Sequence, residues 1–177
     1  REIFWATGAC FCVRTALYKQ MGGFDATLQA HMEEIDLCWR IHKVGYKVYF
    51  CPESTIYHVG GGTMPVTNPR KTYLNFRNST VVLYKNAEAS SVFWKVALKI
   101  FLDLAAALMF LAKGKYKDSR AVVKAVFEFL LGFSKWQKRR KSAQNRKEEL
   151  KISTIYPGIM VFDRYFLGKK KFSQYRF

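Results

Sequence analysis

The first half of the chain carries short apolar runs separated by glycine, proline and polar residues. Residues 3–13 form an apolar run around Gly8, which predicts a buried strand or a strand followed by a turn. Residues 46–50 alternate and are rich in β-forming residues, so they predict a second strand, and residues 54–59 predict a third. Three helices are expected in the same half, over residues 14–21, 33–44 and 72–84.

Two longer helices are predicted in the second half, over residues 92–112 and 119–134. The first is almost entirely apolar, and its three charges recur every four residues, at Lys95, Lys99 and Asp103. On a helix these charges form one narrow stripe. A charge in the middle of a membrane-spanning helix costs about 2.5–3.5 kcal/mol, so a spanning pair is disfavoured. The pattern predicts helices that lie on a membrane surface, and the alternative is a soluble hairpin packed on the rest of the protein.

The positive charge of the chain is concentrated in its second half. Half of the 177 residues are hydrophobic, which is enough for a core and excludes a wholly disordered chain. The formal net charge is +17, of which residues 1–88 contribute +3 and residues 89–177 contribute +14. Each Lys or Arg near an anionic lipid leaflet contributes about 1 kcal/mol of attraction. A nucleic-acid partner is not expected, because no groove-reading motif accompanies the charge.

Three carboxylates stand in the predicted first turn of the helix over residues 33–44, namely Glu33, Glu34 and Asp36. A helix N-terminus favours negative charge, so acidic residues are expected there for structural reasons alone. The preceding segment 22–25 reads Gly-Gly-Phe-Asp, and one face of the helix is apolar, which places the acids at the rim of a core. A carboxylate at such a rim can act as a general base toward a substrate hydroxyl. Both roles stay open on these residues alone.

Six short motifs follow one another in the order and spacing of family 2 glycosyltransferases. They are W-A-T-G-A at 5–9, G-G-F-D at 22–25, E-E-I-D-L-C-W-R at 33–40, G-Y-K-V at 45–48, P-x-S-x-I-x-H at 52–58 and R-N at 77–78. The chain resembles the non-processive, rhamnosyltransferase-like bacterial members of that family over about residues 3–85. The Gln-x-x-Arg-Trp motif of processive members is absent, which favours the addition of a single sugar.

The resemblance implies an α/β fold for part of the chain. Residues 1–88 would form the C-terminal, acceptor-side half of a GT-A nucleotide-diphospho-sugar transferase, and residues 89–177 a helical, membrane-associating extension with a basic tail. The implied activity is inverting transfer of a sugar from a nucleotide-sugar donor to a hydroxyl of a saccharide acceptor, expected to be lipid-linked, in cell-envelope polysaccharide synthesis. The donor-binding strands of the family lie before its acceptor-side half, so this segment is expected to be inactive alone.

The resemblance also assigns the catalytic base. In the family it is the second acid of an acidic pair, which corresponds to Glu34 here. The family usually has Asp at this position, and the longer Glu leaves the choice between Glu33 and Glu34 open. Asp36 is the third candidate in this catalytic group and is expected to cap or orient the helix. Arg40 stands four residues later, where it can pair with Asp36.

The candidate substrate-binding residues come from the same motifs: Trp5, Thr7, Gly8, Asp25, Arg40, Arg77 and Asn78. Gly8 would let a sugar ring approach the backbone, and Trp5 would stack on that ring or be a core aromatic. Asp25 would order its loop. Arg40 would form a helix ion pair or contact phosphate, and Arg77 would bind a diphosphate or lie on a solvated helix face.

His58 is the candidate metal ligand. In GT-A enzymes a His after the corresponding strand can complete a metal site or touch the diphosphate, and imidazole suits Mn²⁺ better than Mg²⁺. A structural His that caps a loop is the alternative. The remaining ligands, an Asp-x-Asp motif, are expected upstream of Arg1.

The expected location is the cytoplasmic face of the bacterial inner membrane, with peripheral attachment. The lipid-linked acceptor and the Lys-rich flanks of the predicted helices favour it. The competing function is a non-catalytic module that binds or anchors to a membrane surface. In that case the acids are a helix cap, and residues 92–151 are the working part.

Overall fold

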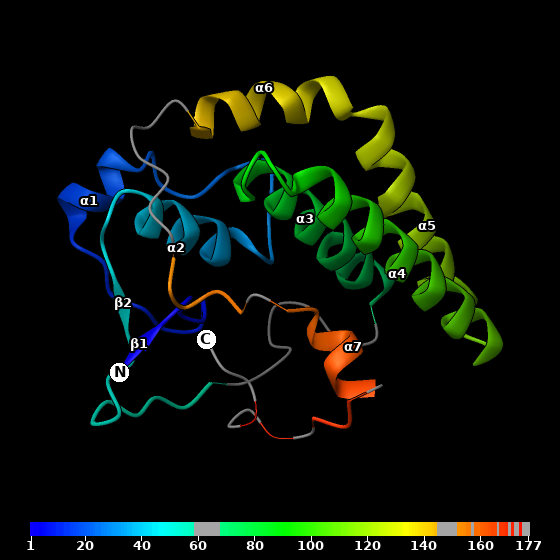
Figure 1. The fold of residues 1–177 in the computed structure, drawn as a ribbon, viewed down its shortest axis with the longest axis horizontal. Coiled ribbons are helices and arrows are strands. Elements are labelled where there is room, and N and C mark those ends of the chain that lie inside the picture. Colours follow the sequence, from blue (N-terminus) through cyan, green and yellow to red (C-terminus); the bar gives the residue numbers. More distant parts are fainter. Residues whose placement is uncertain are drawn as a thin grey trace.

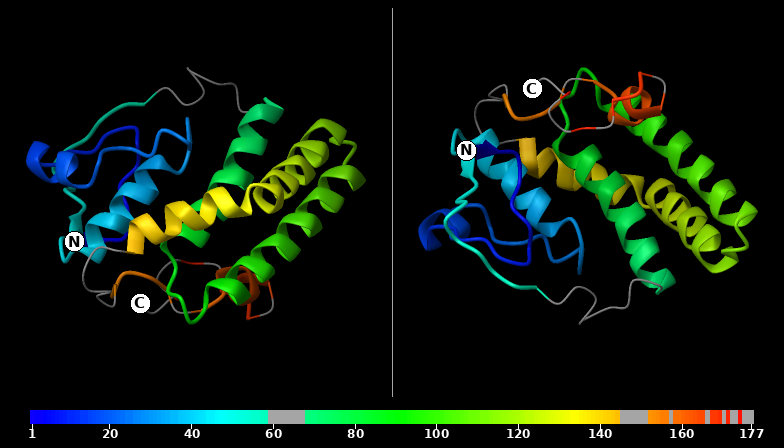
Figure 2. Two further views of the ribbon diagram at one scale, coloured as in Figure 1. Left: turned by 90° about the horizontal axis from the view of Figure 1, so that it is seen from above. Right: turned by 90° about the horizontal axis from the view of Figure 1, so that it is seen from below.

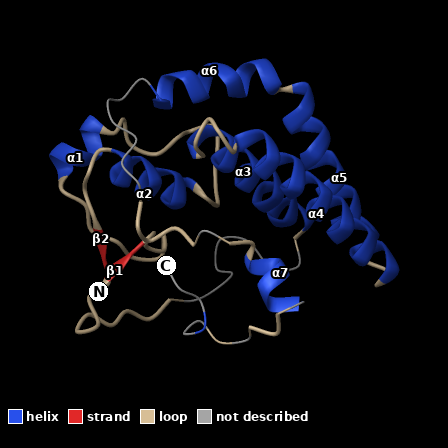
Figure 3. Cartoon of the chain, in the orientation of Figure 1, coloured by secondary structure: helices blue, strands red, loops and turns tan. Residues whose placement is uncertain are grey.

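The computed structural model describes residues 1–58, 68–144, 152–156, 158–165, 167–169, 171 and 174. Helices dominate this described part of the chain, and the strands in it are very short (Figures 1 and 3). The elements run in the order β1 (Glu2–Ile3), α1 (Thr15–Gln20), α2 (Glu33–Lys43), β2 (Val48–Tyr49), α3 (Pro69–Asn86), α4 (Val92–Ala112), α5 (Tyr116–Leu131), α6 (Phe133–Gln144) and α7 (Met160–Tyr165).

The expected strand over residues 3–13 is corrected by the structure. Only Ile3 of this run lies in a strand, where β1 pairs antiparallel with β2, and the rest of the run is loop and turn. The apolar side chains pack on α2 without a strand. The ring of Phe4 lies edge-on to Trp39 at a centroid distance of 5.3 Å and stacks on His42 at 5.7 Å. An apolar run predicts burial, but no residue of this run is buried: Phe4, Phe11 and Val13 are half-buried, and six of its residues are exposed.

The other two expected strands are also shorter or absent in the described residues. The strand over residues 46–50 is confirmed only at Val48–Tyr49. Residues 54–58 are exposed and irregular, and Val59 lies outside the described residues. A single strand pair does not make the α/β half of a GT-A fold, so that expectation is not confirmed. An exposed segment without a neighbouring strand lacks the inter-strand hydrogen bonds that would hold it extended.

The predicted helices are confirmed, with shifted ends. The expectation over residues 92–112 coincides with α4, and that over 33–44 with α2 to within one residue. α3 is longer than the predicted 72–84 and starts at Pro69, where the side chain of Asn68 accepts a hydrogen bond from the Arg70 backbone at 2.9 Å. The basic run that begins at Lys135 also contains a helix, α6.

The helical core is built around α3. This helix contacts α4, α5 and α6, and α4 and α5 lie side by side (Figures 1 and 2). The buried apolar residues of this core come from α3 and the residue after it, from the α4–α6 helices and from the loop before α2: Leu28, Val81, Val82, Tyr84, Ala87, Val92, Val96, Phe129 and Trp136. The core therefore has members on both sides of residue 88, and the proposed division into 1–88 and 89–177 stays a prediction about domains.

A second, smaller apolar cluster holds α2 against the N-terminal segment. Its buried members are Met21, Leu37 and Ile41. Phe11, Val13, Leu17, Tyr18, Val44 and Val48 pack around them. α2 is thus held by the N-terminal segment on one face and by α3 on another. This packing places the first turn of α2, which carries the acidic residues, beside residues 5–9.

Candidate active site at the start of helix α2

The carboxyl group of Glu34 lies against Gly8. A Cβ atom built on Gly8 would be 3.7 Å from the Glu34 carboxyl carbon and 3.8 Å from its Oε1. Thr7 and Gly8 are exposed and Glu34 is half-buried, so the carboxyl lies where a solvent-accessible segment meets the first turn of α2. The structure therefore brings together two residues that the motifs had placed in different roles, a base and an acceptor-side glycine.

Three polar atoms near this first turn are buried and lack a hydrogen-bond partner among the described residues. They are Oε2 of Glu33, Oε2 of Glu34 and Nε2 of His31. A buried polar atom without a partner costs about 1–3 kcal/mol, so most folded proteins pair nearly all of theirs. Several such atoms within four residues mark a place that a ligand or another group would complete.

The loop that leads into α2 is held in a strained backbone conformation. Gln29, His31 and Met32 have φ angles of 60°, 68° and 73°, in the left-handed region that non-glycine residues rarely adopt. Each such residue costs on the order of 1–3 kcal/mol, and such strain persists only where the surrounding structure imposes it. The strain here sets the direction in which α2 starts, and with it the position of Glu33 and Glu34.

Asn78 is the residue that imposes this loop conformation. Its side-chain Nδ2 lies 2.7 Å from the carbonyl oxygen of Leu28 and 2.8 Å from those of Ala30 and His31. Asn78 is completely buried. Its amide hydrogens are directed at the loop, which favours a structural role for this side chain, and substrate binding here stays a prediction. Asn78 is a positioning residue for the start of α2.

Arg77 has a similar structural role and lies in the interior rather than on a solvated face. Its Nε donates to Asn78 Oδ1 at 2.9 Å, and its Nη2 donates to the Thr27 carbonyl oxygen at 2.9 Å. Its Nη1 is 3.2 Å from Glu128 Oε1 on α5. The guanidinium thus connects the loop, α3 and α5. In this arrangement its N–H donors are directed at protein groups, and no pair of them is left to bind a diphosphate.

Asp36 and Arg40 belong to a buried ion-pair cluster behind the first turn. The predicted pairing is confirmed: Arg40 Nε donates to Asp36 Oδ2 at 2.9 Å. Asp36 also accepts from Lys85 Nζ at 2.9 Å and from Asn86 Nδ2 at 2.8 Å. Its exposed fraction is 0%. This enclosure favours the orienting role that was expected for Asp36 over contact with a substrate hydroxyl.

Asp25 completes the cluster from the Gly-Gly-Phe-Asp loop. It accepts from Lys85 Nζ and from Arg139 Nη1, each at 2.8 Å, and from the Thr27 hydroxyl at 2.6 Å. Burial alone would raise the pKa of Asp25, but the hydrogen bonds from Lys85 and Thr27 and the charge of Lys85 hold it well below its usual range. Asp25 therefore orders its loop, as the sequence predicted, through its hydrogen bonds with Thr27.

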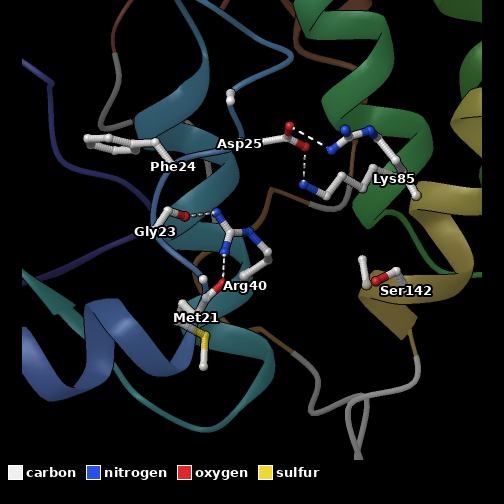
Figure 4. A pocket seen from close by; sticks show the side chains of 11 residues that line it. Met21, Gly23, Phe24, Asp25, Arg40, Lys85 and Ser142 are labelled. Carbon is white, nitrogen blue, oxygen red and sulfur yellow. Dashed lines mark hydrogen bonds and ion pairs between the residues drawn. The ribbon is translucent and has the colours of Figure 1, made fainter.

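A pocket of about 290 Å³ opens beside the cluster, lined by the 21–26 loop, α2, α3 and α6. Figure 4 shows the Arg40 guanidinium directed at the carbonyl oxygens of Met21 and Gly23, at 2.5 and 2.8 Å. Glu34 is six residues before Arg40, about 240° around the helix, so the pocket is on a different face of α2 from Glu34. Three cationic side chains line it, Arg40, Lys85 and Arg139, against the single carboxylate of Asp25, which pairs with Lys85 and Arg139.

Trp5 and His58, the remaining candidates, are exposed. Trp5 is 42% exposed, which rules out the alternative of a core aromatic. His58 lies in an exposed segment that ends where the described residues stop. Among the described residues, no three His, Cys, Asp or Glu side chains gather in a way that would hold a metal ion.

Three residues of the buried cluster were missed by sequence reasoning. Lys85 and Asn86 end α3 and carry no motif, and Arg139 lies in the basic run that composition assigned to membrane attraction. The spacing of Asp36 and Arg40 was the one local signal, because both lie on the same helix face. Ion-pair and hydrogen-bond partners that come from another helix cannot be recognised from the spacing of residues along the chain.

Comparison with known proteins gives a partial likeness. A stretch of 58 residues is 34% identical to N-acetylglucosaminyl-diphospho-decaprenol L-rhamnosyltransferase from two strains of Mycobacterium tuberculosis. The stretch covers 33% of this chain and 19% of each relative's length. No family model and no solved structure matches the chain. The likeness to a rhamnosyltransferase is therefore confined to about a third of this chain, and the chain spans only part of that relative's length.

Proposed function

We propose that the protein is an inverting glycosyltransferase that moves a sugar from a nucleotide-sugar donor to a hydroxyl of a lipid-linked saccharide acceptor. One observation carries the proposal: the Glu34 carboxyl lies against Gly8, with one buried oxygen that has no partner among the described residues. The partial likeness to a rhamnosyltransferase supports the same reaction class. The relatives' name specifies a lipid-diphospho-sugar, which supports an acceptor of that kind for this chain.

Glu34 would act as the general base. Its carboxylate takes the proton of the acceptor hydroxyl while the hydroxyl oxygen attacks the anomeric carbon of the donor sugar. The bond from that carbon to the diphosphate oxygen breaks, the electron pair leaves with the nucleoside diphosphate, and the configuration at the carbon inverts. Gly8, without a side chain, leaves room for the acceptor beside the carboxylate. Asn78 and the left-handed loop hold the carboxylate in place from behind.

Glu33 is the alternative base, and its own buried oxygen also lacks a partner among the described residues. The contact with Gly8 favours Glu34, because the acceptor-side segment then lies next to that carboxyl. Separate Gln variants of the two residues distinguish them, since the one that is the base loses turnover while the other retains most of it.

A divalent cation, Mg²⁺ or Mn²⁺, remains part of the proposal. When bound, it would neutralise the leaving diphosphate. His58 is the described residue proposed to contact it. The test is the apparent metal affinity of His58→Ala in the full-length protein. We expect about a tenfold loss of that affinity with an unchanged melting temperature, because the side chain is exposed. An unchanged metal dependence would remove His58 from the site.

The experiment on the reaction itself is sugar transfer by full-length Glu34→Gln. The variant keeps the shape of the side chain and removes the base, so we expect kcat to fall by about 10²–10⁴-fold. Glu88→Gln is the matched control, because Glu88 is exposed at the connection between α3 and α4. Near-normal kcat in Glu34→Gln, with Glu88→Gln also normal, would refute the assignment.

A non-catalytic, membrane-binding module is the second candidate function. The observation that favours it is the broad exposed apolar surface of α4. The two functions differ in one measurement: the module predicts membrane binding and no transfer with any nucleotide sugar tested, whereas the enzyme predicts transfer that depends on Glu34.

A further inference from the structure

The outward surface of α4 is apolar along the whole helix. Twelve positions of α4 are exposed, and eleven of them carry apolar side chains, the exception being Lys95. The largest are Trp94, Phe93, Phe101 and Leu108, at 81%, 70%, 68% and 67% exposure. A helix of this length is about 30 Å long, so the surface is a continuous apolar strip. Isolated exposed apolar residues are common, but a strip of this extent marks a contact surface.

Two of the three charges in the polar stripe of α4, Lys99 and Asp103, face α3, whereas Lys95 is exposed. Asp103 is 4% exposed and accepts hydrogen bonds from Lys99 Nζ at 2.6 Å and from the Thr80 hydroxyl of α3 at 3.4 Å. Lys99 is half-buried and lies 5.3 Å from the centre of the Phe76 ring, also on α3. In an ordinary surface helix the charges face water and the apolar side faces the core. α4 is inverted in this respect, so its apolar side needs a covering of another kind.

α5 extends the apolar surface. It packs along α4 (Figure 2), and its exposed side includes Phe127, Leu130 and Leu131, at 59%, 51% and 86% exposure. The two helices are joined by a short turn around Gly114, whose φ of 70° suits a glycine. Lys113, Lys115 and Lys117, all exposed, lie at this turn. The strip therefore ends in a cluster of positive charge.

The sign of the surface charge is uniform around these helices. Residues 89–144 contain three acidic residues, and none is exposed. Each accepts a hydrogen bond from α3: Asp103 from Thr80, Asp118 from Thr72 and Glu128 from Tyr73. The exposed charges in the same range are all positive: Lys95, Lys113, Lys115, Lys117, Arg120, Lys124, Lys135, Lys138 and Lys141.

We propose that the outward face of the α4–α5 hairpin docks on an anionic lipid bilayer, with α4 lying in the plane of the interface. Apolar side chains enter the acyl boundary, and the surrounding Lys and Arg side chains meet lipid phosphates. No helix in the described part of the chain is long and apolar enough to cross a membrane. Docking is independent of whether Glu34 is a base, so it can fail or succeed separately from the proposed reaction.

Other occupants fit these observations less well. A second copy of the chain would bring the same positive rim to the interface, and like charges would oppose the contact. A protein partner normally supplies directed hydrogen bonds, at about one per 100–200 Å² of interface, and the strip carries no polar side chain except at its margin. A lipid bilayer requires no directed partner in its apolar layer and supplies negative charge at its surface.

The test is sedimentation of the full-length protein with vesicles of phosphatidylcholine alone and with 30% phosphatidylserine. We expect at least tenfold stronger binding to the anionic vesicles. Phe101→Glu and Leu108→Glu, which place a charge on the strip, are expected to reduce this binding at least tenfold. Tyr57→Glu is the matched control, because Tyr57 is 97% exposed in the 51–58 segment. Lys113→Glu/Lys115→Glu is expected to abolish the preference for phosphatidylserine.

A second measurement keeps the proposal falsifiable without relying on loss of binding. Fluorescence quenching by brominated lipids should include a Trp94 component that is absent in Trp94→Phe. Equal binding of wild type and Phe101→Glu, or equal binding to both vesicle types, overturns the proposal. A fall of several degrees in the melting temperature of Phe101→Glu without vesicles, or a dimer that this substitution dissociates, also overturns it, since the face would then be covered by protein.

Discussion

Gly8 and Glu34 are in contact: the carboxyl carbon of Glu34 lies 3.7 Å from the position that a Cβ on Gly8 would take. This is an ordinary van der Waals distance, so the glycine is not required to avoid a clash with the carboxyl itself. What the missing side chain leaves is open space on the solvent side of that carboxyl, where Thr7 and Gly8 are exposed. The relationship predicts that side-chain size at position 8 controls access to Glu34.

Substitution of Gly8 should therefore reduce activity in proportion to size. Gly8→Ala adds only the Cβ and should change kcat/KM less than about threefold, whereas Gly8→Val should lower it by at least about tenfold, since misplacement of about 1 Å can cost 10²-fold. Stability should change by less than about 0.5 kcal/mol, because position 8 is exposed. The measurements are transfer kinetics and denaturant unfolding, with Ala9→Val as the control. Equal activity of the Val variant and wild type would contradict the prediction.

Asp36 should be the most sensitive residue of α2 for stability. Asp36→Asn removes the charge that pairs with Arg40 and Lys85, both nearly buried, and breaking one side of a buried pair costs about 3–5 kcal/mol. Urea unfolding followed by circular dichroism measures this change. Glu88→Gln, the same type of change at an exposed site, should cost less than about 0.5 kcal/mol. Similar stability of the two variants would contradict a structural role for the cluster.

Asn78 should affect both stability and turnover. Asn78→Asp keeps the size of the side chain but cannot donate to the carbonyls of Leu28, Ala30 and His31. Because a buried carbonyl without a donor is unfavourable, we expect the free energy of unfolding to fall by about 1–3 kcal/mol. Release of the left-handed loop should also displace Glu34 and lower kcat while leaving KM for the donor nearly unchanged. Unfolding curves and transfer kinetics test the two effects. A variant with reduced stability and normal kcat would separate Asn78 from the site.

His42 predicts a dependence of stability on pH. Burial lowers the pKa of His42, although the carbonyl oxygens of Phe4 and Ile3 oppose this shift. Its Nε2 lies 3.0 Å from the Phe4 carbonyl oxygen. Because the unfolded chain binds the proton first, His42 stabilises the fold fully above about pH 6.5. This contribution declines as the pH falls from there toward the lowered pKa, by at most about 1.4 kcal/mol per pH unit.

The measurement is the free energy of unfolding at intervals between pH 7.5 and pH 5.0, for wild type and His42→Gln. The Gln variant keeps a hydrogen-bond donor and does not titrate, so the difference between the two proteins should narrow as the pH falls. A constant difference over this range would show that His42 does not titrate between the folded and unfolded states.

Several features of the protein follow from local sequence. The spacing of apolar and charged residues predicts α2, α3, α4 and α5, because residues three and four apart lie on one side of a helix. Asp36 and Arg40 pair because residues four apart lie on one helix face. The acids of the first turn, Glu33 and Glu34, are expected at a helix start on electrostatic grounds. In each case the feature depends only on residues that are close to one another in the sequence.

Only the tertiary structure decided the direction in which those surfaces face. The pattern predicted the charged stripe and the broad apolar side of α4; in the structure Lys99 and Asp103 pack on α3 and the apolar side faces outward. Arg77 and Asn78 were candidates for substrate contact and became the supports of a loop fifty residues earlier in the chain. The apolar run 3–13 lies half-buried or exposed beside α2 rather than buried in a sheet. The local pattern of apolar and polar residues determines that a surface must be covered. The partner that covers it comes from segments distant in sequence, and neither periodicity nor spacing shows how those segments are arranged.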